Sequence, residues 1–170
     1  MNWKTFFILI FIVNIILSIF SMAILPDRVA IHFGFGGVAD SWAPKHIHSV
    51  VFTIVDFFLF FLLYYTPNLI LLCPPQLINL PNKKYWLQEA NRERLFNKLS
   101  VMMWKFGAAF FTFLFLVQML VIQANRSDPV RLDEKTFLFF LGLFILYTIY
   151  WTIQMYRTFK IPPEQSNYDM

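Results

Sequence analysis

The feature that most limits the possible folds of this chain is an uncharged apolar run from Phe6 to Leu25. Its only polar members are Asn14, Ser18 and Ser21, and their spacing places them on one face of a helix. At about 1.5 Å of rise per residue, such a helix spans roughly 30 Å, the thickness of the hydrocarbon core of a bilayer. A cleaved signal sequence is the alternative interpretation, but its apolar core is usually only about 7–15 residues long. We therefore predict a retained membrane-spanning helix.

Three further apolar runs have the length of membrane-spanning helices. The four predicted spans are residues 6–25, 50–72, 106–123 and 137–156. The composition also indicates a membrane protein, because the chain is 58% hydrophobic and 14% charged, whereas soluble domains are about 45–50% apolar and about 25% charged. We predict an all-α, polytopic membrane protein: a single domain of four transmembrane helices over residues 1–160, followed by a flexible tail over 161–170.

The distribution of Lys and Arg predicts the orientation of these spans. Nine of them lie before the first span, between the second and third, and after the fourth, and five lie in the other two connections. The positive-inside rule therefore places both termini in the cytoplasm and residues 26–49 outside. The net charge of +4 does not indicate a nucleic-acid partner, because the basic residues flank apolar runs instead of covering one polar face. The predicted partner is the lipid bilayer.

Residues 26–49 form a polar connection that glycine and proline interrupt. Glycines at positions 34, 36 and 37 permit positive φ and tight turns, so we predict an ordered outer loop that folds back on the membrane surface. Asp40 is expected to cap the segment that leads into the second span or to pair with Lys45. The residues predicted to form a binding or structural motif in this loop are Pro26, His32, Phe33, Gly37, Asp40, Trp42 and Lys45.

Between the second and third spans, apolar side chains recur at three- and four-residue steps among charged ones. This pattern predicts an amphipathic helix over residues 82–100 that lies in the membrane interface, with its basic face toward lipid phosphates or a cytoplasmic partner. A simple connector along the membrane surface is the alternative. The candidate residues of this interfacial helix are Asn82, Lys83, Tyr85, Trp86 and Arg92.

Three of the polar residues inside the predicted spans are candidates for a functional role, and Asp56 is the most unusual of them. A carboxylate inside an apolar helix is unfavourable unless it is paired, protonated or hydrated, so Asp56 is a candidate functional residue. The alternative is an interfacial carboxylate that pairs with Lys45 or Arg28. Asn14 and Gln118 are the other two, and they could line a path with Asp56 or hydrogen-bond between helices.

The sequence gives little support for catalysis. His32, His46 and His48 could bind Zn²⁺ or Cu²⁺ if His46 and His48 lay on one face of a strand, with Asp40 and Asp56 nearby. No HExxH or CxxC motif and no paired carboxylates accompany them. We therefore predict a protein that is not an enzyme, with no catalytic residues, cofactor or metal, and we leave the histidine site open as an alternative.

Two groups of short motifs resemble a family of bacterial integral membrane proteins. The first group consists of Leu25-Pro26-Asp27, Ile31-His32-Phe33, Gly37-Val38-Ala39-Asp40-Ser41-Trp42 and Pro44-Lys45, and the second of Leu80-Pro81-Asn82-Lys83, Tyr85-Trp86-Leu87 and Arg92-Glu93. The family is a domain of unknown function that also forms the N-terminal part of the sporulation-delaying-toxin immunity proteins. Ala30 and Ser41 differ from the proline and glycine that are usual in the family at these positions.

This resemblance implies a multi-pass protein of the bacterial inner membrane with an ordered outer loop. It supports an immunity role only in part, because the immunity proteins carry further helices beyond the four predicted here. We predict that the chain binds or senses a peptide toxin or another protein partner at the outer loop, as an immunity or signalling protein. The alternative is a small transporter or transporter subunit that uses Asp56, which would act as a homo-oligomer because four spans are few for a transporter.

Overall fold

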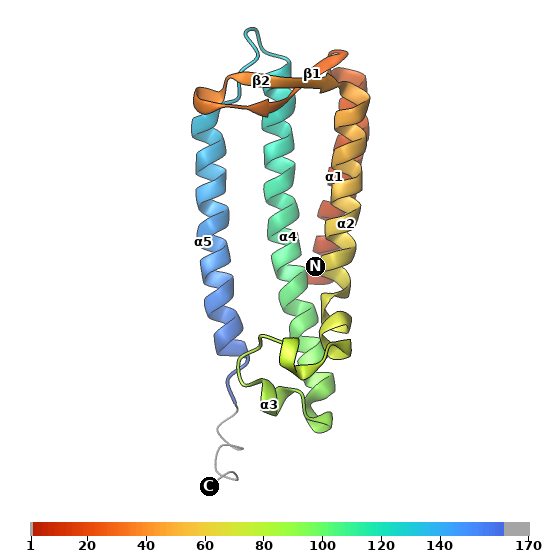
Figure 1. The fold of residues 1–170 in the computed structure, drawn as a ribbon, viewed down its shortest axis with the longest axis vertical. Helices are drawn as coiled ribbons and strands as arrows, with labels where there is room; N and C mark the ends of the chain where they lie inside the picture. The colour runs from red at the N-terminus through yellow and green to blue at the C-terminus, as the bar shows by residue number, and fades with distance from the viewer. Residues whose placement is uncertain (1, 162–170) are drawn as a thin grey trace.

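The computed structural model describes residues 2–161, in which four long helices form an elongated bundle (Figure 1). The four helices are α1 (Trp3–Ile24), α2 (Lys45–Leu72), α4 (Arg92–Asn125) and α5 (Glu134–Thr158). Each of them is long and apolar enough to cross a membrane. The predicted membrane protein with four helical spans is therefore confirmed, and the predicted tail over 161–170 lies outside the described residues except for Ile161.

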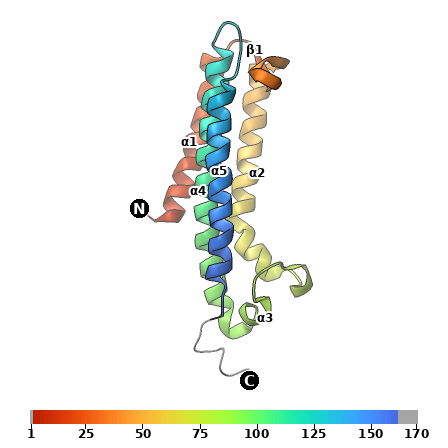
Figure 2. The same ribbon diagram turned by 90° about the vertical axis from the view of Figure 1, so that its left-hand side faces the viewer.

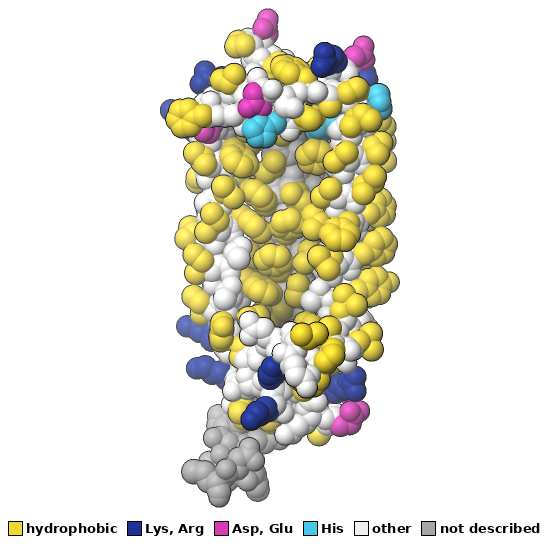
Figure 3. Space-filling model, in the orientation of Figure 1, with side chains coloured by type: hydrophobic (Ala, Val, Ile, Leu, Met, Phe, Trp, Pro, Cys, Tyr) yellow, Lys and Arg dark blue, Asp and Glu magenta, His cyan; other side chains and the backbone are white. Residues whose placement is uncertain are grey.

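Hydrophobic side chains cover the middle of the bundle, and charged side chains gather at its two ends (Figure 3). Apolar groups there face outward, since the helices leave many large aliphatic and aromatic side chains exposed. Such a surface is stable only in an apolar solvent, so the bilayer is the medium that this fold requires. The same distribution places the two polar ends at the two membrane interfaces.

One end of the bundle carries an element that the sequence did not predict, an antiparallel hairpin of β1 (Arg28–Phe33) and β2 (Ala39–Pro44). A 3₁₀ turn over Phe35–Gly37 joins the strands. The predicted all-α class therefore holds for the spans but not for the outer loop. We call this end of the bundle the hairpin end, and the opposite one, where α3 (Lys83–Trp86) lies, the α3 end (Figure 1).

Helix α4 lies in the middle of the bundle, with α5 on one side and α1 and α2 on the other (Figures 1 and 2). The α1–α2–α4 interface is largely aromatic: the rings of Phe7 and Phe11 stack on Phe60, and both contact Phe111. Gly107 of α4 makes room for this cluster, because a Cβ at that position would overlap the Phe7 ring. Helix α5 has no buried residue and packs mainly against α4.

Residues 82–100 do not form the single interfacial helix that the periodicity predicted. Helix α3 ends at Trp86, a 3₁₀ turn follows over Glu89–Asn91, and α4 begins at Arg92. The extended backbone of Gln88 separates the two helices. No helix-breaking residue lies between Arg92 and the apolar segment, so the charged and apolar segments continue as one helix.

Candidate functional site: the hairpin end of the bundle

The β1–β2 hairpin lies across the hairpin end of the bundle as a flat lid (Figure 1). Arg28 pairs with Pro44 at its base and Phe33 with Ala39 near its tip, with irregular register around His32. A two-stranded hairpin alone is at best marginally stable in water, so its order depends on contacts with the helices.

The first of these contacts is made by Asn125, the last residue of α4. Its Oδ1 accepts a hydrogen bond of 2.6 Å from the backbone N–H of Ala30, and its Nδ2 donates one of 3.1 Å to the carbonyl of the same residue. Both residues are buried. The side-chain amide of Asn125 thus pairs with the free edge of β1 as a third strand would. Sequence reasoning missed this residue, because the partners are far apart in the chain.

The second contact holds the tip of the hairpin against the connection between α4 and α5. Arg131 Nε donates a 2.7 Å hydrogen bond to the Gly36 carbonyl, and the Leu132 N–H donates a 2.8 Å bond to the Gly37 carbonyl. Gly37 has a φ of 74°, and a Cβ there would collide with the carbonyl oxygen of Leu132. The prediction of a positive φ is confirmed for Gly36 and Gly37 and is wrong for Gly34, whose φ is −79°. The close approach of Leu132 adds a second reason for glycine at position 37.

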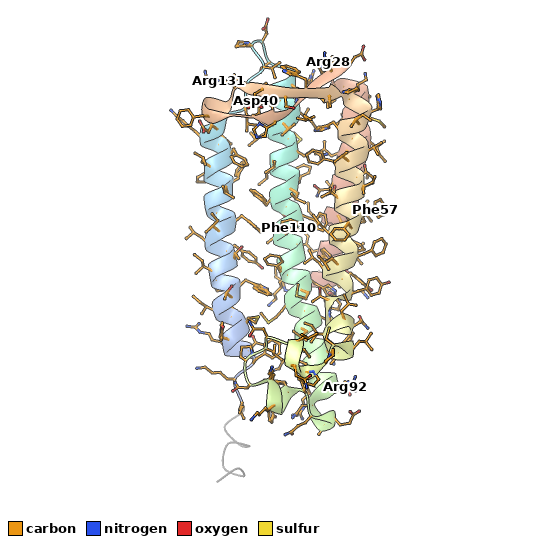
Figure 4. The ribbon with its side chains drawn as sticks, in the orientation of Figure 1. Arg28, Asp40, Phe57, Arg92, Phe110 and Arg131 are labelled. Carbon is orange, nitrogen blue, oxygen red and sulfur yellow. The ribbon has the colours of Figure 1, made fainter. Side chains whose placement is uncertain are left out.

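The charged residues of the hairpin pair differently from the prediction. Asp40 Oδ1 lies 2.6 Å from His32 Nδ1, and both side chains are exposed. Lys45 instead lies 3.2 Å from Asp27 Oδ1, and it also donates to the Leu25 carbonyl. The expected Asp40–Lys45 pair is therefore wrong, because antiparallel pairing of the strands brings Asp40 to His32. Asp40 and Arg131 are labelled at the hairpin end in Figure 4.

Apolar side chains stand out from this lid. Phe35 is 99% exposed, and Ile31, Val38 and Trp42 are between 42% and 55% exposed. Phe33 is half-buried. Because the backbone of the hairpin is fixed from two sides, these side chains form an exposed surface of defined shape.

The comparison with protein families concerns this same region. Residues 9–55 match the domain of unknown function DUF1648. The chain carries a DUF1648 domain. The match covers most of α1, the whole hairpin and the first third of α2. No curated protein and no solved structure is significantly similar to the chain.

The predicted family resemblance is therefore confirmed for the DUF1648 domain. The motifs that carried it, Leu25–Asp27 and Gly37–Trp42, lie at the base and tip of the hairpin. Pro26 is exposed at the turn between α1 and β1. The link to immunity proteins stays a prediction.

Inside the bundle, the predicted polar residues lie on buried helix faces. Asn14 Nδ2 donates to the Ile10 carbonyl at 2.8 Å and to the Phe111 carbonyl at 3.0 Å, which ties α1 to α4. Gln118 Nε2 donates to Ser18 Oγ at 2.6 Å and ties the same two helices together. Helix packing is thus one role of these two amides.

Asp56 lies on the buried face of α2 and is only 2% exposed. Among residues 2–161, no hydrogen bond or ion pair joins its carboxyl to Lys45, to Arg28 or to any other side chain. The predicted interfacial pairing of Asp56 is therefore wrong. Helix α2 begins at Lys45, five residues earlier than predicted, and this places Asp56 about three turns from the hairpin end.

The three histidines do not meet. His46 and His48 lie on α2 rather than on a strand, so their side chains point to different faces, and His48 is buried whereas His46 is exposed. His32 is bonded to Asp40. In the described part of the chain, no group of three or more His, Cys, Asp or Glu side chains is placed to hold a metal ion.

Three candidate residues of the interfacial segment donate hydrogen bonds to carbonyls at the ends of helices. Asn82 and Trp86 both donate to the carbonyl of Phe159, which follows α5, at 2.8 and 2.9 Å. Arg92 donates to the Leu71 carbonyl in the last turn of α2 at 3.0 Å (Figure 4). These bonds satisfy carbonyls that have no partner within their own helices.

Two further members of that segment also make intramolecular contacts. Lys83 Nζ donates to the carbonyls of Pro75 and Ile78. The ring of Tyr85 packs edge-on against Trp86. The segment therefore joins the ends of α2, α4 and α5 at the α3 end of the bundle.

Proposed function

We propose that this protein is a non-enzymatic membrane protein that recognises a peptide or protein partner at the β1–β2 hairpin, as an immunity or signalling protein does. The observation that carries this proposal is a hairpin anchored to α4 and to the α4–α5 connection, with Phe35 fully exposed at its tip. An exposed apolar side chain on a fixed backbone is a feature of recognition surfaces.

Two physical arguments support recognition at this place. Binding by a preformed surface avoids the cost of ordering a loop, and the contacts of Asn125 and Arg131 have already ordered this one. Aromatic side chains also dominate the energetics of interfaces, and Phe35 and Trp42 are both available on the hairpin. The His32–Asp40 pair beside them provides polar contacts that can fix the orientation of a partner.

The charge distribution supports an outward-facing hairpin. Most Lys and Arg residues belong to segments at the α3 end, so the positive-inside rule favours a cytoplasmic α3 end and cytoplasmic termini. In a bacterial inner membrane, the hairpin would then meet peptides that arrive from outside the cell. Membrane-active peptide toxins are the class of partner that fits both this position and the apolar tip.

The test is the survival of a sensitive bacterium that expresses the protein and is challenged with membrane-active peptide toxins. We expect protection by the wild type and loss of protection by Phe35→Ser. The matched control is Leu77→Ser, which removes another exposed apolar side chain (77% exposed) at the opposite end of the bundle. Both variants replace exposed side chains, so neither should change folding, and membrane expression is measured for each.

The outcome that contradicts the proposal is equal protection by Phe35→Ser and wild type, or no protection by any of the proteins against any toxin. Asp40→Ala tests whether polar contacts of the hairpin contribute to recognition. If the partner binds at the hairpin, Asp40→Ala should weaken protection and Asp56→Asn should leave it unchanged. Transport through the bundle predicts the opposite ranking of these two variants.

A further inference from the structure

The interior of the bundle contains polar side chains whose oxygen atoms receive no hydrogen bond. The positions of these side chains follow from the packing of α1 against α2. Ser21 Oγ of α1 lies 3.0 Å from Ser49 Oγ of α2, and the two helices are antiparallel. Seven residues, or two turns, further toward the α3 end, the helices reach Asn14 and Asp56. Since seven residues return to the same face of a helix, these two side chains lie at the same depth on facing sides.

The third helix adds a glutamine one turn nearer the hairpin end. Gln118 of α4 bonds to Ser18 of α1, which is four residues along the chain from Asn14. Asn14 and Gln118 are each 1% exposed and Asp56 is 2% exposed, so all three side chains are buried. Three amide or carboxyl side chains thus share the buried interface of α1, α2 and α4.

The hydrogen bonds of the two amides leave their oxygen atoms without donors. Both hydrogens of the Asn14 amide are used, for the carbonyls of Ile10 and Phe111, so Asn14 can only accept a further bond. Gln118 Nε2 donates to Ser18, and Gln118 Oε1 is buried with no partner among the described residues. The carboxyl of Asp56 adds further acceptors, so this interface contains several oxygen atoms to which no group among the described residues donates a hydrogen bond.

Nothing that faces Asp56 supplies a compensating charge. Helix α1 from Phe6 to its end and α4 from Phe106 to its end carry no ionisable side chain. On α2 the nearest ionisable groups are His48 and Tyr64, each eight residues or more than two turns away. An ionised carboxylate at this depth would be an unpaired charge in an apolar medium, which is strongly unfavourable.

We propose that Asp56 is a proton-binding site in the membrane interior. The carboxylate takes up one proton, and the neutral acid donates its O–H to the side-chain oxygen of Asn14. This single proton removes the unpaired charge and gives the side-chain oxygen of Asn14 a donor. The hydroxyl groups of Ser18, Ser21 and Ser49 lie between this site and the hairpin end. The proposal does not depend on recognition at the hairpin.

The test is infrared difference spectroscopy on the full-length protein reconstituted in lipid vesicles at neutral pH. We expect a carbonyl-stretch band of a protonated carboxylic acid in the wild type, and its complete loss in Asp56→Asn. The matched control is Asp27→Asn, which changes an exposed carboxylate and should leave the band in place. Asn14→Leu should keep the band but shift its frequency, because the O–H loses its acceptor.

Two results would overturn the proposal. The first is an identical carboxylic-acid region in wild type and Asp56→Asn, which would show that Asp56 is ionised. The second is a melting temperature that rises with Na⁺ over choline in the wild type but not in Asp56→Asn, which would assign a metal cation to the site. If Asp56→Asn does not fold, Asp56→Glu replaces it: the band should then persist at a shifted frequency, and its absence would reject proton binding.

Discussion

Replacement of Asn125 by leucine should release the hairpin from the bundle while it leaves the helices in place. The variant keeps the branched shape and the number of heavy atoms of the side chain but removes both hydrogen bonds to Ala30. Two such bonds contribute about 1–3 kcal/mol together, and each buried backbone group left without a partner costs about 1–3 kcal/mol. Because the freed strand can open to water and recover part of this loss, we expect the local stability of β1 to fall by about 2–4 kcal/mol.

Hydrogen–deuterium exchange measured by mass spectrometry in lipid nanodiscs provides the assay. Since about 1.4 kcal/mol corresponds to a factor of ten, exchange of the β1 amides should become about 30- to 700-fold faster. Peptides from the middle of α1 and α4 should exchange as in the wild type. The control is Gln123→Leu, an exposed position two residues away on the same helix. Unchanged β1 exchange in the Asn125 variant would refute the reasoning that this amide holds the hairpin.

Two further predictions concern the other helix ends. Trp86→Phe removes the Nε1–H donor to the Phe159 carbonyl but keeps an aromatic ring in the core. The free energy of unfolding, measured by denaturation in detergent, should therefore fall by about 1 kcal/mol. The control is Trp3→Phe at an exposed ring, which should change this free energy by less than about 0.5 kcal/mol. Asp133 accepts hydrogen bonds from the side chain and backbone of Thr136 at the start of α5, and these bonds lower the pKa of its carboxyl. Because the pKa is lowered, the stabilisation of the helix start is complete above the unfolded-state pKa of about 3.9 and is lost as the pH falls through the folded-state value. Hydrogen–deuterium exchange in the first turn of α5 should therefore become faster below about pH 4, and this change should be smaller in Asp133→Asn. An equal response to acid in both proteins would contradict this assignment.

The prediction of the spans succeeded because a transmembrane helix is specified locally. A bilayer offers no hydrogen-bond partners, so an apolar segment of sufficient length satisfies its own backbone as a helix whatever it later packs against. The boundaries were less accurate where polar residues continue a helix beyond the apolar run. Helix α4 extends back to Arg92 for this reason, and the predicted interfacial helix was divided between α3 and the first turns of α4.

The candidate site was predicted only as a region. Glycine at position 37 indicated the tight turn, and the polar loop indicated an ordered lid, since backbone freedom and polarity can be read from single residues. The pairing of Asp40 with Lys45 was predicted wrongly, because the register of the strands, which no local pattern shows, brings Asp40 to His32.

What the sequence determined by itself is therefore the number of helices, their membrane environment and the position of the lid, all of which follow from hydrophobicity and glycine along short segments. The tertiary structure alone decided which groups meet. Asn125 reaches Ala30, and Gln118 reaches Ser18, across separations of 95 and 100 residues. The depth of Asp56 relative to Asn14 likewise depends on how two helices are aligned. Such contacts depend on packing in three dimensions, and no local pattern in the chain records them.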